Sequence, residues 1–333
     1  MQRPIVVGSR RSIRRLWNLS ALPYRKICIP ISDGPASAAH AKSDPVTSDF
    51  YNFNLAFAPQ PTYRVFCVSA ASGQTTILAT IPGVLAYLHS LFLTQDYILL
   101  CVWNSAIDGS KFVKSAYVDA VLPFDATQTA KWYVVDRKAG QGLIATYETP
   151  AFFCFHTVNA WQEPSKDDPS QTDIVAELVK HDNLDILKAL YYENLISNSP
   201  AAISLVRGRD DASRSSIARF RLPHIPTVAD TEKHTGHIER IEAKYLSPEL
   251  PMFNPSYACR PHRYTYAMIN RNESTFFDSL MKFDSEIKEA RLWHRHGHSP
   301  SEAIFVANPN DTDEDSGVLL SVVLVGTKEK SYL

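Results

Sequence analysis

Three histidines lie in apolar surroundings, where an imidazole ring needs a partner. They are His40 in SAAHAKSD, His89 in LAYLHSLFL and His156 in FFCFHTVNAW. A buried imidazole without a partner costs about 1–3 kcal/mol, so each ring is expected to form a hydrogen bond or to ligate a metal. Taken singly, each is more often a hydrogen-bonded core histidine than a ligand, because most buried polar groups have such partners.

A second group of histidines has a local chelating spacing. His294, His296 and His298 alternate along the chain, and on a β-strand this would place all three rings on one face. Neutral imidazole is a common ligand of transition metals, so the run could bind one. Arg295 and the loop-forming neighbours favour an exposed strand end instead.

The sequence contains no other catalytic signature that we recognise. It has neither a nucleophile elbow nor a P-loop, and Gly140 and Gly142 lack the strand-to-helix setting of a dinucleotide fingerprint. The five cysteines are widely spaced and form no Cys-x-x-Cys pair. This spacing excludes a zinc ribbon or finger and indicates buried free thiols in a reducing compartment.

The elements that must position these histidines are predicted to be β-strands. Short β-branched and aromatic runs recur between turn residues along most of the chain, from residues 63–70 to residues 317–325. This pattern is typical of an all-β sandwich, barrel or propeller.

Two segments depart from the strand pattern. Residues 184–195 place apolar side chains at helical spacing and predict one surface helix that ends before Pro200. Residues 83–103 are long and apolar enough to imitate a membrane span. The polar break at residues 94–96 predicts instead two strands joined by a turn.

Charge and composition restrict the class of protein. The 333 residues include 34 Lys and Arg against 35 Asp and Glu, a net charge of −1, and 45% are hydrophobic. Phosphate contacts need a clustered positive excess, so we expect no nucleic acid as a partner.

Residues 1–35 are rich in Arg and have no acidic residue before Asp33. This composition resembles that of a transit peptide, and the alternative is an atypical N-terminal segment without a targeting role. In either case we expect the domain to span residues 36–333.

Ordered motifs along the chain resemble the carotenoid cleavage oxygenases. Around His40 the sequence reads AAHAKSDPVTSDFYNFNL, similar to the Ala-His-x-Lys-x-Asp-Pro-x-Thr-Gly segment of that family. The other matching motifs follow in the family's order: YLHS and LTQDY within 87–97, FHTVNAW at 155–161, ELP at 249–251, NP at 254–255, RYTY at 263–266, EAIFV at 302–306 and EDSGVLLSVV at 314–323. The wording is closest to the fungal torulene and β-carotene oxygenases.

The resemblance implies a seven-bladed β-propeller, incomplete in this chain, with a non-haem Fe(II) on its axis. Four histidines hold the iron in this family, and His40, His89 and His156 match three of them. Carboxylates that hydrogen-bond the ligands match Glu249, expected to serve His156, and Glu302, whose usual partner is the fourth histidine. The fourth histidine of the family belongs to a Phe-His-Gly-like segment that this sequence lacks. We therefore expect this chain to be part of a longer enzyme. No catalytic group beyond the metal site and no other cofactor site is implied.

The implied activity is cleavage of a C=C bond of a carotenoid or apocarotenoid by O2, which gives aldehyde products. A stilbene-cleaving oxygenase and a catalytically inactive fragment without the fourth ligand stay open as alternatives. We expect a cytoplasmic protein, and the lipid substrates of the family imply peripheral association with a membrane or lipid droplet. The apolar run at residues 81–85 is the candidate contact, and plain core packing of that run is the alternative.

Overall fold

The computed structural model describes residues 34, 36–57, 59–112, 117–197, 199–200, 202, 214–273 and 275–333. The expected N-terminal segment, apart from Gly34, therefore lies outside the described residues. Strands dominate the described chain and form successive sheets in chain order.

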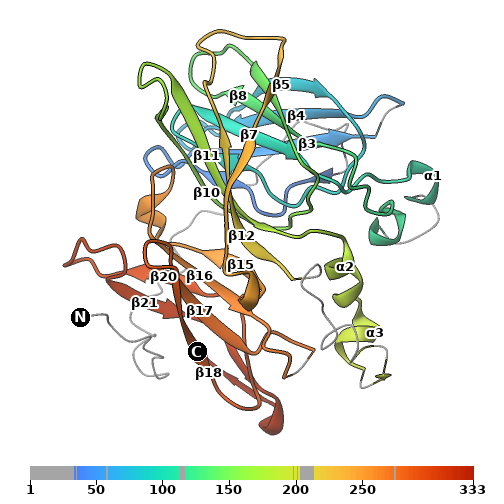
Figure 1. Ribbon diagram of the computed structural model, residues 1–333, viewed down its shortest axis with the longest axis vertical. Helices are drawn as coiled ribbons and strands as arrows, with labels where there is room; N and C mark the ends of the chain where they lie inside the picture. Colours follow the sequence, from blue (N-terminus) through green and yellow to red (C-terminus); the bar gives the residue numbers. More distant parts are fainter. Residues whose placement is uncertain are drawn as a thin grey trace.

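The first two sheets lie in the upper part of Figure 1. The first consists of β1 (Ala36–Ser37), β2 (Lys42–Ser43), β3 (Phe50–Ala56), β4 (Thr62–Val68) and β5 (Thr75–Pro82). The second consists of β6 (Phe92–Leu93), β7 (Tyr97–Val102), β8 (Ala130–Asp136), β9 (Leu143–Thr149) and β13 (Lys233–Thr235). All neighbouring strands are antiparallel except β13, which pairs with β9 in parallel.

Two further antiparallel sheets follow, and the second of them lies in the lower part of Figure 1. The third sheet consists of β10 (Thr157–Pro164), β11 (Thr172–Lys180), β12 (Ser216–Leu222) and β14 (His237–Glu242). The fourth consists of β15 (Pro248–Met252), β16 (Tyr264–Ile269), β17 (Ser279–Asp284) and β18 (Glu289–His294). Two smaller sheets contain β19 (His298–Pro300), β22 (Val323–Val325) and β23 (Lys330–Tyr332), and β20 (Ile304–Ala307) and β21 (Gly317–Leu320).

Helices are few and short in the described chain. The α-helices are α1 (Gly109–Phe112), α2 (Asp185–Ala189) and α3 (Tyr192–Leu195). The 3₁₀ turns are η3 (Tyr117–Ala120), η4 (Lys244–Leu246), η5 (Pro255–Tyr257) and η6 (Gly326–Lys328).

An edge strand of each of the four larger sheets meets an edge strand of the next at the centre of this arrangement. β2 packs beside β6, β6 beside β10, and β10 beside β15. Meandering sheets that converge in this way are the blades of a β-propeller, so the predicted all-β propeller is confirmed. Against the seven blades that the resemblance implies, the described residues form four sheets of four or five strands and the two smaller ones.

Aromatic side chains fill the space between the second and third blades. Trp132 of β8 lies 5.6 Å from Phe92 of β6 and 5.1 Å from Phe220 of β12, measured between ring centroids. Phe152, just before the third blade, packs 4.8 Å from Phe220. All four side chains are buried. Large rings of this kind contribute much of the apolar burial that holds neighbouring sheets together.

The apolar segment at residues 83–103 forms strands, as predicted. β6 pairs with β7 in an antiparallel hairpin, and the N–H of Thr94 donates to the carbonyl of Tyr97 across the turn. Among the described residues, no helix has the length and apolar character needed to cross a membrane.

The prediction of one continuous helix over residues 184–195 is wrong. Two short helices, α2 and α3, form there, because Tyr191 between them has an extended backbone with φ −62° and ψ 139°. The hydroxyl of Tyr191 donates a hydrogen bond to Asp119 at 2.5 Å. This contact accompanies the break, and tertiary context often outweighs local helical preference.

The strand pattern did not predict β3, although this strand is buried along most of its length. Asn52 and Asn54 interrupt its apolar run, and asparagine is depleted in strands. Their side chains have a structural role instead. Asn52 exchanges two hydrogen bonds with the backbone of Ala38, and the amide of Asn54 donates to the carbonyl of Gly34.

We predict that Arg137→Met lowers the free energy of unfolding by about 3 kcal/mol, because breaking a buried ion pair leaves a charge unpaired. Arg137 forms a buried ion pair with Asp44, covers the ring of Tyr51 at 4.7 Å and donates to the carbonyl of Thr94 at 2.9 Å. It thus ties the first blade to the second.

Urea unfolding measures the effect of Arg137→Met, and Lys138→Met provides the matched control. Lys138 forms an exposed pair with Asp96, and such pairs contribute about 0–1 kcal/mol. Equal stability losses in the two variants would contradict the structural role of Arg137.

Candidate metal centre

Three histidines each lie just before a strand of a different blade. His40 lies just ahead of β2, His89 ahead of β6, and His156 directly before β10. Because β2, β6 and β10 lie side by side, residues far apart in the sequence are brought together. The backbone N–H of His40 donates to the carbonyl of His89 at 3.1 Å.

Hydrogen bonds of two hydroxyl groups connect the segment that leads into β6 with the start of β10. The hydroxyls of Ser90 and Thr157 lie 2.7 Å apart, and that of Thr157 also donates to the carbonyl of Leu91 at 3.0 Å. The backbone next to His89 is thereby fixed against the backbone next to His156.

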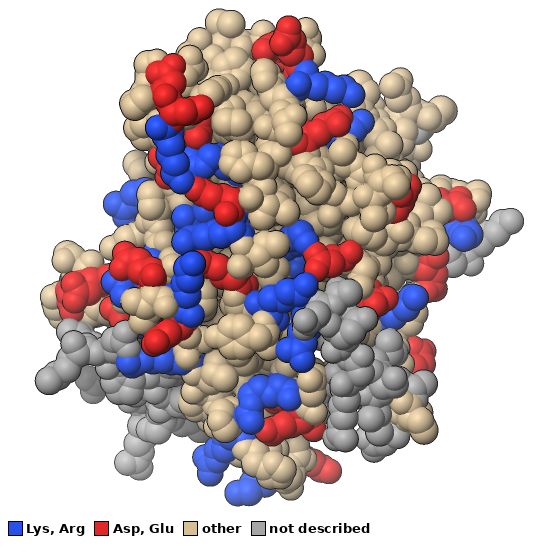
Figure 2. All heavy atoms as spheres, viewed as in Figure 1, with Lys and Arg blue, Asp and Glu red and all other residues tan. Residues whose placement is uncertain are grey.

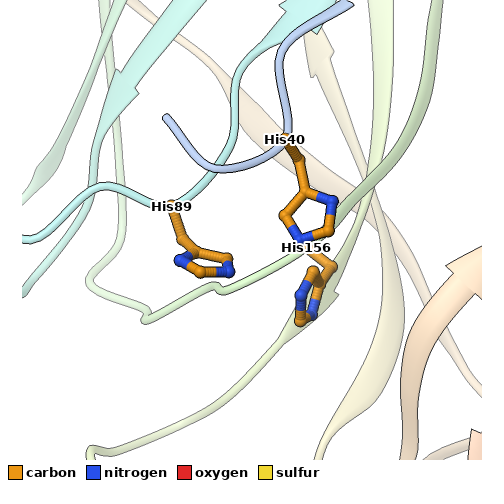
Figure 3. A group of neighbouring side chains, drawn as sticks. All are labelled: His40, His89 and His156. Carbon is orange, nitrogen blue, oxygen red and sulfur yellow. The ribbon is translucent and has the colours of Figure 1, made fainter. Parts of the chain in front are cut away.

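The three imidazoles form one compact cluster (Figure 3). One ring nitrogen from each of His40, His89 and His156 lies within 4.8 Å of the other two. The ring centroids are 5.0 Å apart for His40 and His89, 4.6 Å for His40 and His156, and 5.2 Å for His89 and His156. Among the described residues this is the one group of histidine, cysteine or acidic side chains with such spacing.

The environment of His40 and His89 favours the neutral form of both rings. Burial, and then the charges of His156 and His89, lower the pKa of His40 to about 4. Burial and the charge of His156 lower the pKa of His89 to about 4 as well. Since a metal binds the unprotonated nitrogen, both rings are ready donors near neutral pH.

Glu249 lies directly behind His156. Its Oε2 is 2.5 Å from Nδ1 of His156, and its Oε1 is 2.7 Å from Nε2 of His181. Burial by itself raises the pKa of Glu249, but the charges and hydrogen bonds of His156 and His181 hold it well below its usual value. An ionised carboxylate on Nδ1 fixes the tautomer of His156 and leaves Nε2 free to bind a metal.

The backbone around Glu249 is irregular in a way that holds this carboxylate. The pairing of β15 with β16 shifts between Glu249 and Met252, and Leu250 has a left-handed backbone with φ 50°. The N–H of Leu250 donates to Oε2 of Glu249 at 2.8 Å. Such bulges and left-handed non-glycine residues concentrate at functional sites.

Aromatic groups surround the other side of the cluster. The hydroxyl of Tyr87 lies 3.2 Å from Nδ1 of His89. Phe155 packs against His89 and His156, with ring centroids 5.6 and 5.9 Å away, and Phe153 packs against Phe155 at 4.8 Å. These rings limit the access of water to the imidazoles.

Glu302 holds a different position from Glu249. It is half-buried, and burial raises its pKa while the charge of His156 opposes this rise. Within the described residues, its carboxylate forms no hydrogen bond with any of the three clustered histidines.

The run of histidines near residue 296 lies outside the cluster. His294 ends β18, His298 begins β19, and His296 is exposed in the turn between them. Nδ1 of His298 donates to the carbonyl of His296 at 2.7 Å. The structure therefore agrees with an exposed strand end.

Sequence reasoning missed His181 and Tyr87 as neighbours of the cluster. His181 follows β11 and is 3% exposed, so it is fully part of the core. No motif marks it, because its role depends on the position of Glu249. Tyr87 stands two residues before His89, a spacing that places both on one side of an extended chain.

We predict that acid destabilises the metal-free protein between about pH 6.5 and pH 4. In the unfolded chain His40 and His89 bind protons near their ordinary pKa of 6.5, but in the folded protein only near 4. The unfolded state therefore binds more protons in this interval, and stability falls as the pH falls. Below its ordinary value of 4.5, the lowered pKa of Glu249 acts in the same direction.

Urea unfolding at several pH values tests this expectation. A His40→Asn/His89→Asn double variant should show a flatter decline, because both shifted groups are removed. An unchanged decline in that variant would assign the acid sensitivity to other groups.

The donor set fits a divalent transition metal. Neutral imidazoles suit iron, zinc, copper and nickel, and three protein ligands with open positions are typical of catalytic sites. The hydrogen bond from His156 to the Glu249 carboxylate is the outer contact that metal-ligating histidines commonly make.

The chain matches a known family over most of its length. The family model of the retinal pigment epithelial membrane protein matches residues 15–333. The carotenoid dioxygenase of Neurospora crassa is 39% identical over 322 residues, which cover 91% of this chain and 52% of the relative. The torulene dioxygenase of Fusarium fujikuroi is 38% identical over 317 residues, with 91% and 55% covered. The chain thus spans about half the length of these relatives.

Solved structures share the fold. A variant of the Synechocystis apocarotenoid oxygenase superposes with a TM-score of 0.69 at 19% identity, and the match covers 92% of this chain and 60% of that one. The cobalt-substituted Synechocystis enzyme gives a TM-score of 0.65 at 19% identity, with 89% and 58% covered.

Proposed function

The chain belongs to the carotenoid oxygenase family, that of the retinal pigment epithelial membrane protein, and from this premise we propose that it carries the iron centre of a carotenoid-cleaving dioxygenase. The proposed reaction breaks one C=C bond of a carotenoid or apocarotenoid with O2 and gives two carbonyl products, normally aldehydes. The observation that supports it most directly is the cluster of His40, His89 and His156 at the meeting point of three blades.

Each side chain has a separate task in this proposal. The three imidazoles would hold Fe(II), which supplies the activation of O2 when bound. The Glu249 carboxylate accepts a hydrogen bond from the Nδ1–H of His156 and keeps that ring oriented. Phe155 and its aromatic neighbours exclude water and offer an apolar surface to a polyene.

The test is oxygen-dependent cleavage by the chain reconstituted with Fe(II). Torulene and β-carotene in detergent micelles serve as substrates, and visible absorbance and mass spectrometry report substrate loss and aldehyde products. We expect turnover in the wild type and in His296→Ala but none in His156→Ala. Cleavage of a stilbene alone would favour the stilbene-cleaving alternative, and bound iron without any cleavage would favour the inactive fragment.

Charged side chains of both signs are mixed on one face of the described chain (Figure 2). On the face shown in Figure 2, basic and acidic side chains are interspersed, as expected for a net charge of −1. No single-sign field on this face points to a polyanion.

Membrane association stays a prediction, and the structure narrows its candidate contact. Within the run at residues 81–85, Val84 is 56% exposed, Ile81 is buried and Leu85 packs against the core. We expect Val84→Ser to weaken co-sedimentation with phospholipid vesicles by about tenfold, since burying a valine is worth about 1.5 kcal/mol. The control is Val228→Ser, another exposed valine. Equal binding of both variants and the wild type would remove this contact.

A further inference from the structure

His181 is a buried histidine next to the metal cluster, but it is not one of the three clustered rings. It lies directly after β11, and its side chain is 3% exposed. Its Nε2 is 2.7 Å from Oε1 of Glu249, and the other oxygen of this carboxylate accepts from Nδ1 of His156. Glu249 therefore connects a ligand of the candidate metal centre to a histidine to which the proposed function gives no role.

The backbone of His181 is tied to the segment that carries His156. The N–H of His181 donates to the carbonyl of Phe153 at 2.9 Å, and the N–H of Phe153 donates to the carbonyl of His181 at 3.0 Å. Two residues before His181, the N–H of Val179 donates to the carbonyl of His156 at 3.0 Å. Residues 179–181 thus hold the backbone on which the ligand is placed.

The side chain of His181 holds a carboxylate that comes from the next blade. Glu249 belongs to β15 of the fourth blade, whereas His181 ends a strand of the third. Oε2 of Glu249 accepts from Nδ1 of His156 and from the N–H of Leu250, but no other described residue than His181 donates to Oε1. If the N–H of His181 were removed, Oε1 would be buried without a partner, which is costly for an ionised group.

The clustered histidines differ in their outer partners. Nδ1 of His89 lies 3.2 Å from the hydroxyl of Tyr87, and among the residues that the structure describes no carboxylate forms a hydrogen bond with His40 or His89. Glu249, on His156, is therefore the anionic partner at this cluster. Because outer partners orient metal ligands and raise their basicity, the group that holds Glu249 in place affects the whole site.

We propose that His181 is a positioning residue of the metal centre: its Nε2–H holds the Glu249 carboxylate in the orientation in which it accepts from His156. The role assigned to His181 rests on the proposed function, because it requires that the three clustered histidines bind a metal. His181 itself does not touch the metal in this proposal and acts only through Glu249.

Titration of the full chain with Co(II), followed by visible absorption and calorimetry, tests this role. His181→Phe keeps an aromatic ring against Phe153 and Phe155, whose centroids lie 5.9 and 6.2 Å from that of His181, but it has no N–H donor. We expect it to weaken Co(II) binding about tenfold, the lower end of the usual cost of losing an outer partner. His181→Gln should restore most of the affinity, because its amide provides an N–H donor.

His262→Phe is the matched control. His262 is also buried, its Nε2 lies 3.3 Å from Oε2 of Glu177, and it is outside the metal cluster. The same substitution there should leave the Co(II) affinity equal to that of the wild type. If His181→Phe does not fold, His181→Leu, which likewise lacks a donor, takes its place and should show the same loss.

A double variant separates positioning from a general effect on the structure. In the Glu249→Ala background the carboxylate is absent, so adding His181→Phe should cause little further loss of Co(II) affinity. Unchanged affinity in His181→Phe, an equal loss in His262→Phe, or a full additional loss in the Glu249→Ala background would overturn the role of His181.

Failure of the metal centre itself gives a different result. A wild type that binds no Co(II), or His156→Ala that binds it as the wild type does, would refute the proposed function together with the role of His181. Binding that is lost in His156→Ala but unaffected in His181→Phe would refute only the role of His181.

Discussion

His156→Ala is expected to weaken binding of a divalent metal by more than about 100-fold, beyond the 10–100-fold that loss of an outer hydrogen-bond partner costs. His156 is the ring whose orientation is fixed by Glu249, and it lies within ring-contact distance of both His40 and His89. Its removal leaves two imidazoles, which cannot enclose an ion as three do. Co(II) is a convenient probe, because neutral imidazoles are suitable ligands for divalent transition metals.

The visible absorption of bound Co(II) and calorimetric titration both measure this loss. His296→Ala is the matched control, since His296 is an exposed histidine outside the cluster. The affinity of His296→Ala for Co(II) should equal that of the wild type. An equal loss in both variants, or full Co(II) binding by His156→Ala, would exclude the cluster as the metal centre.

Glu249→Gln is expected to weaken Co(II) binding by about 10–100-fold, the usual cost of losing an outer carboxylate. The amide keeps the shape of the side chain but no longer provides the negative charge beside Nδ1 of His156. Glu249→Ala should in addition lower the free energy of unfolding by about 3 kcal/mol, because His156 and His181 both lose a buried partner. Metal titration and urea unfolding separate the two effects.

Glu302→Gln supplies the comparison for this experiment. Glu302 is half-buried and makes no hydrogen bond with the three histidines among the described residues, so its variant should keep both affinity and stability. If Glu302→Gln loses as much affinity as Glu249→Gln, the effect reflects the general electrostatic field and not a specific contact with His156.

The sequence marked the three histidines more clearly than it marked their surroundings. Each stood in an apolar segment, and family-like motifs surrounded all three. Glu249 followed from the same resemblance, whereas His181 carried no motif and was found only because its ring lies 2.7 Å from Glu249.

The sequence by itself determined the β class of the protein. Alternating apolar runs and turn residues specify strands locally, and strands such as β7, β9 and β16 form within the part of the chain where this pattern recurs. Local signals failed where tertiary contacts dominate, as in β3, whose buried asparagines bind the backbone of Ala38 and Gly34.

Only the tertiary structure decided which of these residues act together. His40, His89 and His156 meet because β2, β6 and β10 converge, and such non-local packing has no signature in the short segments around each histidine. The carboxylate of Glu249 is placed next to His156 by a β-bulge and by the left-handed backbone of Leu250. A left-handed conformation cannot be predicted from the sequence at a residue other than glycine. Strand formation depends on neighbours in the sequence, whereas the site depends on neighbours in space.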